Sequence, residues 1–339
     1  KMFKLMNKKI LFVGDLKYDI YEKSLGDGFK KIDYDVYFFK SEKNDFKNKL
    51  INKLNIFYDI FLSCRIDLKF LEKVKIIKPD IIFLWRALSI KAKTIKEIKD
   101  RYPRVKIILH HNDNPFVNSS LKLKCINFFK CIKLSDLVLA YRKSDFFYIK
   151  KYGGKKIKLF LPYMCTKKHK PHNLKKNNDV IFIGHYEDDN RVGIIKQLHK
   201  SGVKYEIYGN NWEKIIKDNK ELNIFNKEFI GLSYSKKIAS SKIALIFLSK
   251  TNKDVYTRRC FEIPACKTLM LMEENNQIKK IFKENKEIFF WNNTNKKFIQ
   301  VLQKILNIKY YNKIVERSFD KVLKKHNEII RAKEIDKWL

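Results

Sequence analysis

Two arginines and a glutamate stand close together in the segment TRRCFEIPACKTLML, residues 257–271. Arginine side chains bind phosphate oxygens through paired hydrogen bonds, and a carboxylate accepts hydrogen bonds from a vicinal diol such as that of a ribose. Arg258 and Arg259 are therefore candidates to hold a diphosphate, and Glu262 is a candidate to hold a ribose. The alternative is that Glu262 only complements a helix dipole and pairs with Arg258, four residues earlier.

The elements on either side would place this segment at one edge of a sheet. An apolar strand, KIALIFLS (242–249), precedes it, and a polar loop follows that strand. Asp254 or Thr257 can cap the next helix, so both arginines and Glu262 would lie in its first turns. Because a helix N-terminus attracts anions and ligands bind at the carboxyl ends of parallel strands, we expect a nucleotide site here.

Short apolar runs alternate with helical patterns along the whole chain, which predicts an α/β protein with parallel, doubly wound sheets. Helices are expected at 19–32 and 44–62, and one long helix at 310–339. The expected strands of the first half are 10–14, 36–39, 80–85, 106–111 and 136–141. Those of the second half are 179–184, 205–209, 242–249, 268–272 and 287–291.

A polar stretch, TKKHKPHNLKKNN (166–178), interrupts this alternation and is typical of a linker. We therefore expect a Rossmann-like domain at 1–165, the linker at 166–178, a second Rossmann-like domain at 179–309, and a C-terminal helix at 310–339. Two such domains facing each other would form a cleft lined by the carboxyl ends of their strands.

Further candidates follow other strands of the second domain. Gly184 and His185 end its first strand, and glycine lets a backbone approach a phosphate closely. Tyr208 and Gly209 end the next strand and are expected to border the nucleobase. Arg191 begins the intervening helix, where it would reach the diphosphate or a base. The alternative for Arg191 is a surface ion pair with the nearby acidic residues, Glu187 or Asp188.

Two aspartates follow strands of the first domain. Asp15 comes directly after Gly14, and Asp113 lies in HHNDNPF (110–116). Either would act on an acceptor hydroxyl, as a base or as an orienting group. For Asp15 the alternative is a helix cap or turn residue. His110 is expected to pack in the core, and His111 to lie near the same cleft.

Several of these strings, in this order, resemble motifs of the glycosyltransferase superfamily with two Rossmann-like domains, the GT-B fold. The segment TRRCFEIPACKTLML is similar to the R-x-F-E-x-x-A-C-G pattern of the bacterial CgeB-like group. The strings ILFVGD, HHNDNPF, DVIFIGHYEDDNR and IYGNNW agree with it along much of the chain.

The resemblance implies roles for the residues that match. Glu262 would bind the ribose of a nucleotide sugar. Family-four glycosyltransferases carry a second acidic residue eight positions earlier that contacts the donor sugar, and here Asp254 stands in that place. The glycine of the pattern is Lys267 in this chain, so we expect the turn it makes to be lost. The resemblance also implies that the C-terminal helix packs back on the first domain.

Composition bears on the partners. The chain has 74 Lys and Arg residues against 37 Asp and Glu, a formal net charge of +37. Because Lys is spread along the whole sequence and no RNA-binding or zinc-finger pattern occurs, we expect a solvated lysine coat and no specific nucleic acid. Weak attraction to an anionic membrane stays open, with LKLKCINFFKCIK (121–133) as the segment to examine; the alternative there is a helix facing the core.

No metal or other cofactor is expected. The D-x-D string at 33–35 precedes a strand and so lies at the wrong edge of the sheet, and the six cysteines form no CxxC pair. Free thiols and the absence of a signal peptide predict a cytoplasmic protein, with peripheral attachment to the inner face of the cell membrane as an open variant. Met6 is a candidate natural start.

The sequence thus favours a metal-independent glycosyltransferase. It would move a sugar from a nucleotide-sugar donor to a saccharide or lipid-linked glycan acceptor, in bacterial surface polysaccharide synthesis. The alternatives are a basic binding protein for nucleic acid or acidic polysaccharide, and a sugar-nucleotide epimerase of the same fold. The base, the sugar, the acceptor, the stereochemical course and the oligomeric state are left open.

Overall fold

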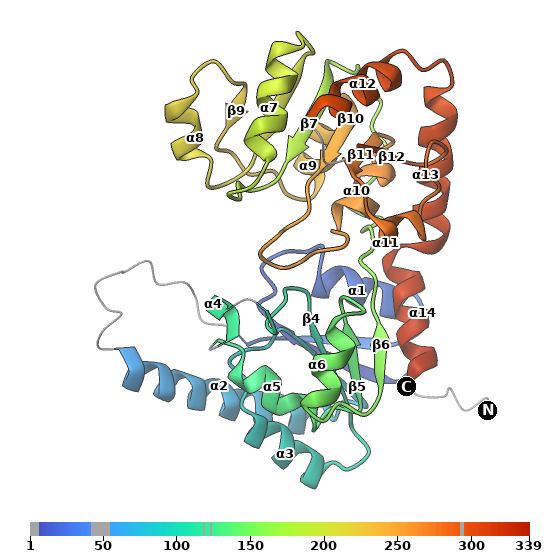
Figure 1. Cartoon of the computed structure of the whole chain (residues 1–339). Coiled ribbons are helices and arrows are strands. Elements are labelled where there is room, and N and C mark those ends of the chain that lie inside the picture. The colour runs from blue at the N-terminus through green and yellow to red at the C-terminus, as the bar shows by residue number, and fades with distance from the viewer. Residues whose placement is uncertain (1–6, 42–54, 118, 123, 292–294) are drawn as a thin grey trace, which may run out of the picture. The chain divides into compact units, whose positions relative to one another are not determined.

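The structure, a computed structural model, describes residues 7–41, 55–117, 119–122, 124–291 and 295–339. The chain forms two compact units (Figure 1). The first comprises Lys1–Leu161 together with Glu328–Leu339, and the second comprises Pro162–Asn327. The chain therefore leaves the first unit once and returns to it with its last helix.

The first unit is built on a six-stranded parallel sheet with the order β2-β1-β3-β4-β5-β6. Its strands are β1 (Lys9–Gly14), β2 (Asp35–Lys40), β3 (Ile81–Trp85), β4 (Lys106–His111), β5 (Leu137–Ala140) and β6 (Ile157–Leu159). Its helices are α1 (Glu22–Lys30), α2 (Asn55–Ile77), α3 (Ala92–Arg101), α4 (Ser119–Lys122), α5 (Ile126–Ile132), α6 (Asp145–Lys151) and α14 (Glu328–Trp338). The central strands are buried along their whole length, as expected where helices cover both faces.

The second unit repeats this plan with the strand order β12-β11-β10-β7-β8-β9, again parallel. Its strands are β7 (Asn178–Ile183), β8 (Tyr205–Tyr208), β9 (Ile224–Phe225), β10 (Ser241–Ile246), β11 (Leu269–Glu273) and β12 (Phe289–Trp291). Its helices are α7 (Arg191–Lys200), α8 (Glu213–Asp218), α9 (Leu232–Ala239), α10 (Arg259–Ala265), α11 (Asn276–Lys279), α12 (Asn295–Leu306) and α13 (Tyr311–Lys325). The prediction of two Rossmann-like parallel sheets is confirmed.

The single long helix expected at 310–339 is wrong, because the chain breaks between α13 and α14. At the break, the backbone N–H of Met164 donates to the carbonyl of His326 (2.9 Å), and Met164 pairs with Asn327 as an isolated bridge. The imidazole of His326 packs on the ring of Phe261, with centroids 5.0 Å apart. These contacts take the backbone out of the helical hydrogen-bonding pattern, and α14 begins afresh at Glu328.

The final helix packs on the first unit, as the resemblance implied. Tyr34 donates a hydrogen bond to Asp336, and Arg331 donates to the carbonyl of Leu161 (2.9 Å). At Gly28 in α1, a Cβ atom would lie 2.2 Å from the carbonyl oxygen of Glu328. Only glycine permits so close an approach of α14.

Other expected helices differ at their ends. The helix expected at 44–62 is observed as α2, which runs on to Ile77, and positions 42–54 lie outside the described residues. The segment 121–133 contains α5, whose Phe128, Phe129 and Ile132 are buried in the core of the first unit. This burial favours the core-helix alternative for most of that segment.

Candidate functional site

Each sheet has one point where the direction of strand addition reverses. In the first unit it lies between β1 and β3, and in the second between β7 and β10. Loops leaving the carboxyl ends of such a strand pair diverge to opposite faces of the sheet and leave a crevice in which ligands bind. The residues that follow these four strands are therefore the candidates for chemistry.

In the second unit the loops after β7 and β8 lie against each other. Gly209 has φ +149°, and a Cβ atom there would lie 1.9 Å from the carbonyl oxygen of Gly184. The N–H of Gly184 donates to the carbonyl of Tyr208 (2.8 Å), and Trp212 Nε1 donates to the carbonyl of Gly184 (2.9 Å). The structure thus brings together the three predicted residues Gly184, Tyr208 and Gly209, presenting bare backbone at this edge.

The side chain of Tyr208 does not point to the backbone surface formed by Gly184 and Gly209. Its ring is buried, stacks on Phe225 with centroids 4.9 Å apart, and has the Lys237 ammonium 4.8 Å from its centroid. Only the backbone of Tyr208 is thus placed to border a ligand.

Arg259, the first residue of α10, reaches across to the end of β7. Its Nε donates to the carbonyl of Ile183 (2.8 Å), and its Nη2 lies 2.8 Å from where a Cβ of Gly184 would be. In the part of the chain that the structure describes, no carboxylate lies within ion-pair distance of this guanidinium. Arg259 therefore presents, beside the glycine, a guanidinium that forms no direct ion pair with these residues.

Glu262 is buried one helical turn further on, within a small polar cluster. Its Oε1 accepts a hydrogen bond from Arg258 Nε (3.0 Å) and faces His169 Nε2 at 3.7 Å. Arg258 in turn lies over the ring of Tyr163, 4.8 Å from the centroid. Both of these contacts are made to Oε1, and Oε2 is the oxygen that we consider for a ligand.

The electrostatics keep Glu262 ionised. Burial alone would raise the pKa of this carboxyl, but His169, Arg258 and Arg259 more than offset it, so the pKa lies below its usual range. Burial lowers the pKa of His169 to about 4, against the opposing effect of Glu262. The backbone N–H of Cys165 donates to His169 Nδ1 (3.0 Å). The neutral imidazole therefore carries its proton on Nε2, toward the carboxylate.

Arg191 is fully engaged with the protein. Its Nε donates to both carboxylate oxygens of Asp189 (3.0 Å each), and its Nη1 donates to the carbonyl of His185 (2.5 Å). Glu187 lies 3.6 Å away and also accepts from His185 Nε2 (3.0 Å). These contacts favour the ion-pair alternative, with Asp189 and Glu187 as partners and with the arginine buried rather than on the surface.

Thr257 and Asp254 complete the predicted residues of the second unit. Thr257 is buried, and its Oγ1 accepts a hydrogen bond from the backbone N–H of Arg259 (3.2 Å). Asp254 is half-buried in the loop after β10, where its N–H donates to the carbonyl of Ser249 (2.9 Å). The expected loss of the turn at Lys267 is wrong. Lys267 has φ +52°, so lysine adopts the left-handed conformation that favours glycine.

In the first unit, Asp15 lies at the point where the strand order reverses. Its Oδ2 is 3.5 Å from Nη1 of Arg86, which follows β3, and its Oδ1 accepts from the N–H of Lys17 (3.0 Å). Three residues without glycine's freedom have positive φ in these two loops: Leu16 (53°), Arg86 (59°) and Ala87 (41°). Backbone strain of this kind concentrates at functional sites, where the surrounding structure must hold it.

Glu22, the first residue of α1, is buried beneath the same loop. A Cβ atom at Gly14 would lie 2.1 Å from Glu22 Oε1, and Glu22 Oε2 receives no hydrogen bond from the described residues. Burial raises the pKa of Glu22 to about 7, helped by the charge of Asp15 and opposed by Arg86. Glu22 is thus a carboxyl group that exchanges its proton near neutral pH.

Asp113 lies after β4, close to two buried polar groups. Its carbonyl faces Nδ1 of His111 (3.2 Å), whose Nε2 contacts the Cys125 thiol at 3.7 Å. His111 is neutral because burial lowers its pKa to about 3, with Arg86 acting in the same direction. Arg86 thus influences both Asp15 and the β4 loop, so the first unit holds one connected polar cluster. His110 packs against Trp85, as predicted.

Three residues of these clusters were not anticipated. Arg86 follows an expected strand, so the strand-end rule that selected Asp15 would also have found it. Glu22 carries no such signal, because its burial depends on Gly14 and the packing of α1. His169 lay in the presumed linker, where a polar neighbourhood concealed that its imidazole is buried.

Comparison with known proteins bears on the family and on the fold. Residues 191–337 match the family described as glycosyl transferase-like, a span that includes α7, α10 and the Arg258–Glu262 cluster. The matched span is less than half of the chain, so it shows a likeness to this family over that span. A search of curated protein sequences found no match.

Solved structures share the GT-B fold over nearly the whole chain. Sucrose-phosphate synthase from Thermosynechococcus elongatus superposes with a TM-score of 0.70 at 10% identity, covering 98% of each chain. HepE from Anabaena, in complex with UDP-glucose, gives 0.66 at 11% identity, covering 97% of this chain and 98% of HepE. The UDP-GlcNAc 2-epimerase of Neisseria meningitidis gives 0.57 at 11% identity, with 98% and 99% coverage.

Two further findings concern metals and membranes. Among the residues that the structure describes, no group of three or more His, Cys, Asp or Glu side chains is arranged to hold a metal ion. A search of the same residues for helices long and apolar enough to cross a membrane found none.

Proposed function

We propose that this protein is a GT-B glycosyltransferase and that it takes its sugar from a nucleoside-diphosphate sugar bound to the second unit. Glu262 Oε2 would accept hydrogen bonds from the ribose hydroxyls. Arg259 would bind the diphosphate, with the bare backbone of Gly184 and Gly209 letting its oxygens approach closely. HepE, which shares the fold and was solved in complex with UDP-glucose, supports a donor of this class.

The observation that carries the proposal is the guanidinium of Arg259, which has no carboxylate partner among the described residues. Arg258 is hydrogen-bonded to Glu262, and Arg191 is hydrogen-bonded to Asp189. The guanidinium of Arg259 instead contacts a backbone carbonyl and an aromatic ring, so its charge is available to an anion. A leaving diphosphate stabilised in this way requires no metal.

In the transfer step, an acceptor hydroxyl oxygen would bond to the anomeric carbon of the donor. The bond from that carbon to the diphosphate oxygen would break, and the diphosphate would keep the electron pair. The hydroxyl proton would pass to Asp15 or Asp113 of the first unit. Asp254 would contact the donor sugar. A saccharide or lipid-linked glycan of a bacterial surface polymer is the acceptor class we favour.

Two alternatives are weighed against this proposal. The epimerase of the same fold shows that a GT-B architecture alone does not define the reaction. The feature that would favour an epimerase is a full set of carboxylates around the anomeric carbon. In the second unit we assign Glu262 to the ribose and Asp254 alone to the sugar. If the protein were instead a basic binding protein, its affinity would depend on net charge and not on any one arginine.

The proposal is tested by calorimetric titration with UDP, GDP, ADP, TDP and CMP, with and without EDTA. We expect one diphosphate to bind with one-to-one stoichiometry, unaffected by EDTA. Replacing Arg259 by Met should weaken binding about 10- to 100-fold, since hydrogen bonds to charged groups contribute about 1.5–3 kcal/mol. Glu262→Gln should weaken the binding of nucleosides and of nucleotides to the same degree, because the Glu262 carboxylate would contact the ribose that both contain.

Arg317→Met is the matched control, because Arg317 is an exposed arginine of the same unit. Its loss changes the net charge equally and should leave nucleotide affinity intact. Equal losses in Arg259→Met and Arg317→Met would reject the site, as would salt-sensitive oligonucleotide binding with no nucleotide binding. A product with an inverted stereocentre and no transfer would instead identify an epimerase.

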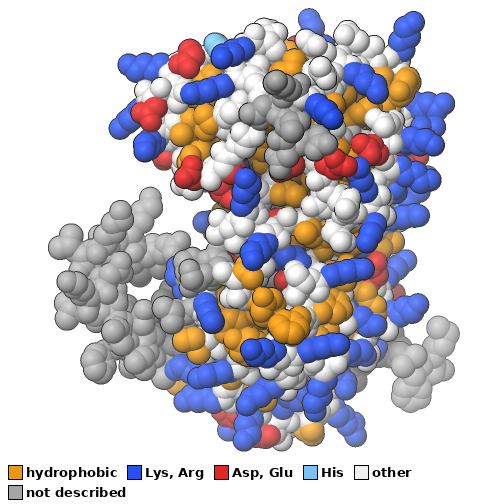
Figure 2. Space-filling model, in the orientation of Figure 1, with side chains coloured by type: hydrophobic (Ala, Val, Ile, Leu, Met, Phe, Trp, Pro, Cys, Tyr) orange, Lys and Arg blue, Asp and Glu red, His pale blue; other side chains and the backbone are white. Residues whose placement is uncertain are grey.

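We also propose that the first unit attaches to an anionic membrane surface through α5 and α6. Phe147 and Ile126 are 70% and 47% exposed, and stacked rings of Phe129 and Tyr152 connect the two helices. Figure 2 shows hydrophobic side chains gathered on the visible face of the first unit with lysines around them. Apolar side chains ringed by lysines suit an interfacial position, near a lipid-linked acceptor.

A further inference from the structure

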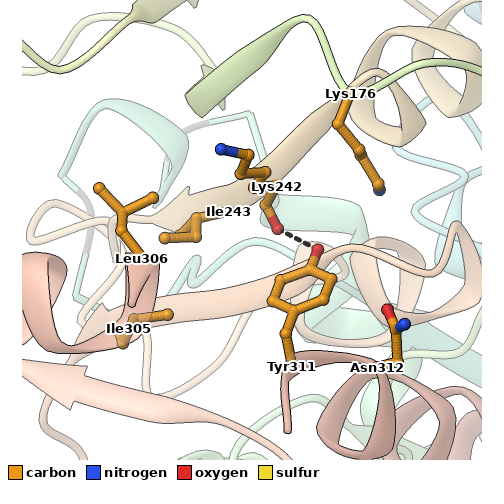
Figure 3. A pocket seen from close by; sticks show the side chains of 7 residues that line it. All are labelled: Lys176, Lys242, Ile243, Ile305, Leu306, Tyr311 and Asn312. Atoms are coloured by element: carbon orange, nitrogen blue, oxygen red, sulfur yellow. Dashed lines mark hydrogen bonds between the residues drawn. The ribbon is translucent and has the colours of Figure 1, made fainter. Parts of the chain in front are cut away.

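A cavity of about 340 Å³ lies at the amino edge of the second unit's sheet. It is formed where β10 begins, α12 ends and α13 begins (Figure 3). The candidate nucleotide residues follow the carboxyl ends of β7, β8 and β10, so this cavity is at the opposite edge of the same sheet. Its volume is within the range of small-molecule sites, and the proposed function makes no use of it.

The cavity is apolar at one end and polar at the other. In Figure 3, Ile305, Leu306 and Ile243 lie together on one side, and Lys176 and Asn312 lie on the other. The ring of Tyr311 lies between them and is fixed by its hydroxyl, which donates to the carbonyl of Lys242 (2.5 Å). A ligand that matches these walls has a polar head and an apolar body.

Lys176 determines which sign of charge the polar head of a ligand must carry to bind. Its Nζ donates to the carbonyl of Lys267 (3.1 Å) and faces Thr268 Oγ1 at 3.4 Å, which leaves the ammonium one further hydrogen to donate. Among the described residues, no carboxylate lies within 4.0 Å of this ammonium. Partial burial lowers the pKa of Lys176 to about 8, so it is cationic at neutral pH.

The second lysine of the cavity differs in this respect. Lys242 Nζ is paired with Asp179 Oδ1 at 2.7 Å, so its charge is already balanced. A partly buried cation without a counter-charge favours an external anion, because its interaction with that anion is less screened than at the surface. The cavity lining includes no acidic side chain from the described part of the chain to oppose one.

We propose that this cavity binds a small amphipathic anion. Its phosphate or carboxylate head would lie against Lys176 and the Asn312 amide. Its apolar body would cover Ile243, Ile305 and Leu306. Such a ligand would be distinct from the nucleotide sugar, since it approaches the opposite edge of the sheet.

Hexyl phosphate is the probe, titrated by calorimetry and by chemical-shift mapping on the full chain. We expect saturable one-to-one binding that shifts Ile305 and Leu306 resonances. Lys176→Met should weaken it at least about tenfold, the loss of one charged hydrogen bond. Inorganic phosphate should bind more weakly than hexyl phosphate, because it leaves the apolar end empty.

Lys175→Met is the matched control, because Lys175 is the exposed neighbour and its loss changes the net charge equally. Leu306→Trp fills the apolar end while keeping Lys176, and should abolish hexyl phosphate binding even if Lys176→Met folds poorly. Equal effects of the two lysine substitutions would overturn the proposal, because they would reveal only attraction to a cationic surface. Full binding by Leu306→Trp would overturn it too.

Discussion

The carboxyl group of Glu22 is held against the backbone of Gly14, with one oxygen that receives no hydrogen bond from the described residues. Asp15 and Arg86 are the charged groups that act on it from the neighbouring loops. Because its pKa is raised to about 7, above the usual 4.5, the folded protein holds this proton more tightly than the unfolded chain does. The stabilisation that Glu22 contributes is therefore fully present below the pKa of the unfolded chain, 4.5. It is lost as the pH rises through the pKa of the folded protein, about 7.

We expect this linkage to be measurable. Between about pH 5 and pH 8 the wild type should lose on the order of 3 kcal/mol relative to Glu22→Gln, which cannot ionise. Urea unfolding of both proteins across this range measures the difference. Glu72→Gln, at an exposed site of the same unit, is the control and should run parallel to wild type. Parallel curves for Glu22→Gln would show that Glu22 titrates normally.

At this scale the sequence predicts residues that follow strands but not residues buried by tertiary packing. Gly184, Gly209, Arg259 and Glu262 were all anticipated because each follows a recognisable strand, and the structure gathers them. Glu22 lies at a helix start whose burial depends on where α1 packs. No local pattern carries that information.

Among the elements, α10 connects the signature residues to the next strand through a left-handed turn. Lys267 makes this turn with φ +52°, and its side chain reaches Glu316 (2.6 Å) and the ring of Phe319 (4.9 Å) on α13. A left-handed conformation costs an L-residue roughly 1–2 kcal/mol. The side-chain contacts offset part of that cost and explain why lysine is tolerated where the family pattern has glycine.

Two substitutions separate the backbone from the side chain. Lys267→Gly and Lys267→Ala both remove the contacts to α13, but only glycine relieves the left-handed conformation. We expect the glycine variant to be more stable than the alanine variant by about 1 kcal/mol in thermal or urea unfolding. Equal stabilities, or a more stable alanine variant, would mean that the turn relaxes to another conformation.

The sequence predicted long apolar elements better than short ones. The expected inner strands are all present, because parallel strands covered on both faces are continuous apolar runs. The edge strands β6 and β9 were missed, since they have only three and two residues. The break between α13 and α14 was missed because the pairing with Met164 that causes it is a long-range contact.

At the scale of the whole molecule, the net charge of +37 is spread rather than focused. Figure 2 shows lysine and arginine side chains over both units of the visible face. A diffuse charge of this kind attracts any polyanion weakly and is screened by salt. In the membrane attachment that we propose, the exposed apolar side chains of α5 and α6 would supply the specificity that this charge lacks.

We expect the chain to sediment with vesicles containing phosphatidylserine, and Phe147→Asp with Ile126→Asp to reduce the bound fraction several-fold. Phe225→Asp is the control, since Phe225 is an aromatic residue of the second unit that is 43% exposed, close to the 47% of Ile126. High salt screens the attraction between lysines and lipid, so only apolar insertion holds the wild type on the vesicles. We therefore expect the double variant to bind less than the wild type at high salt as well. Identical sedimentation of all three proteins would leave the lysine coat as the whole explanation.

The return of α14 to the first unit has a consequence for synthesis. A ribosome releases residues 162–327 as one uninterrupted stretch, and every segment of the second unit is then available to fold. The first unit begins earlier but still lacks α14, whose Arg331, Ala332 and Ile335 are buried against it. The domain begun first is therefore completed last.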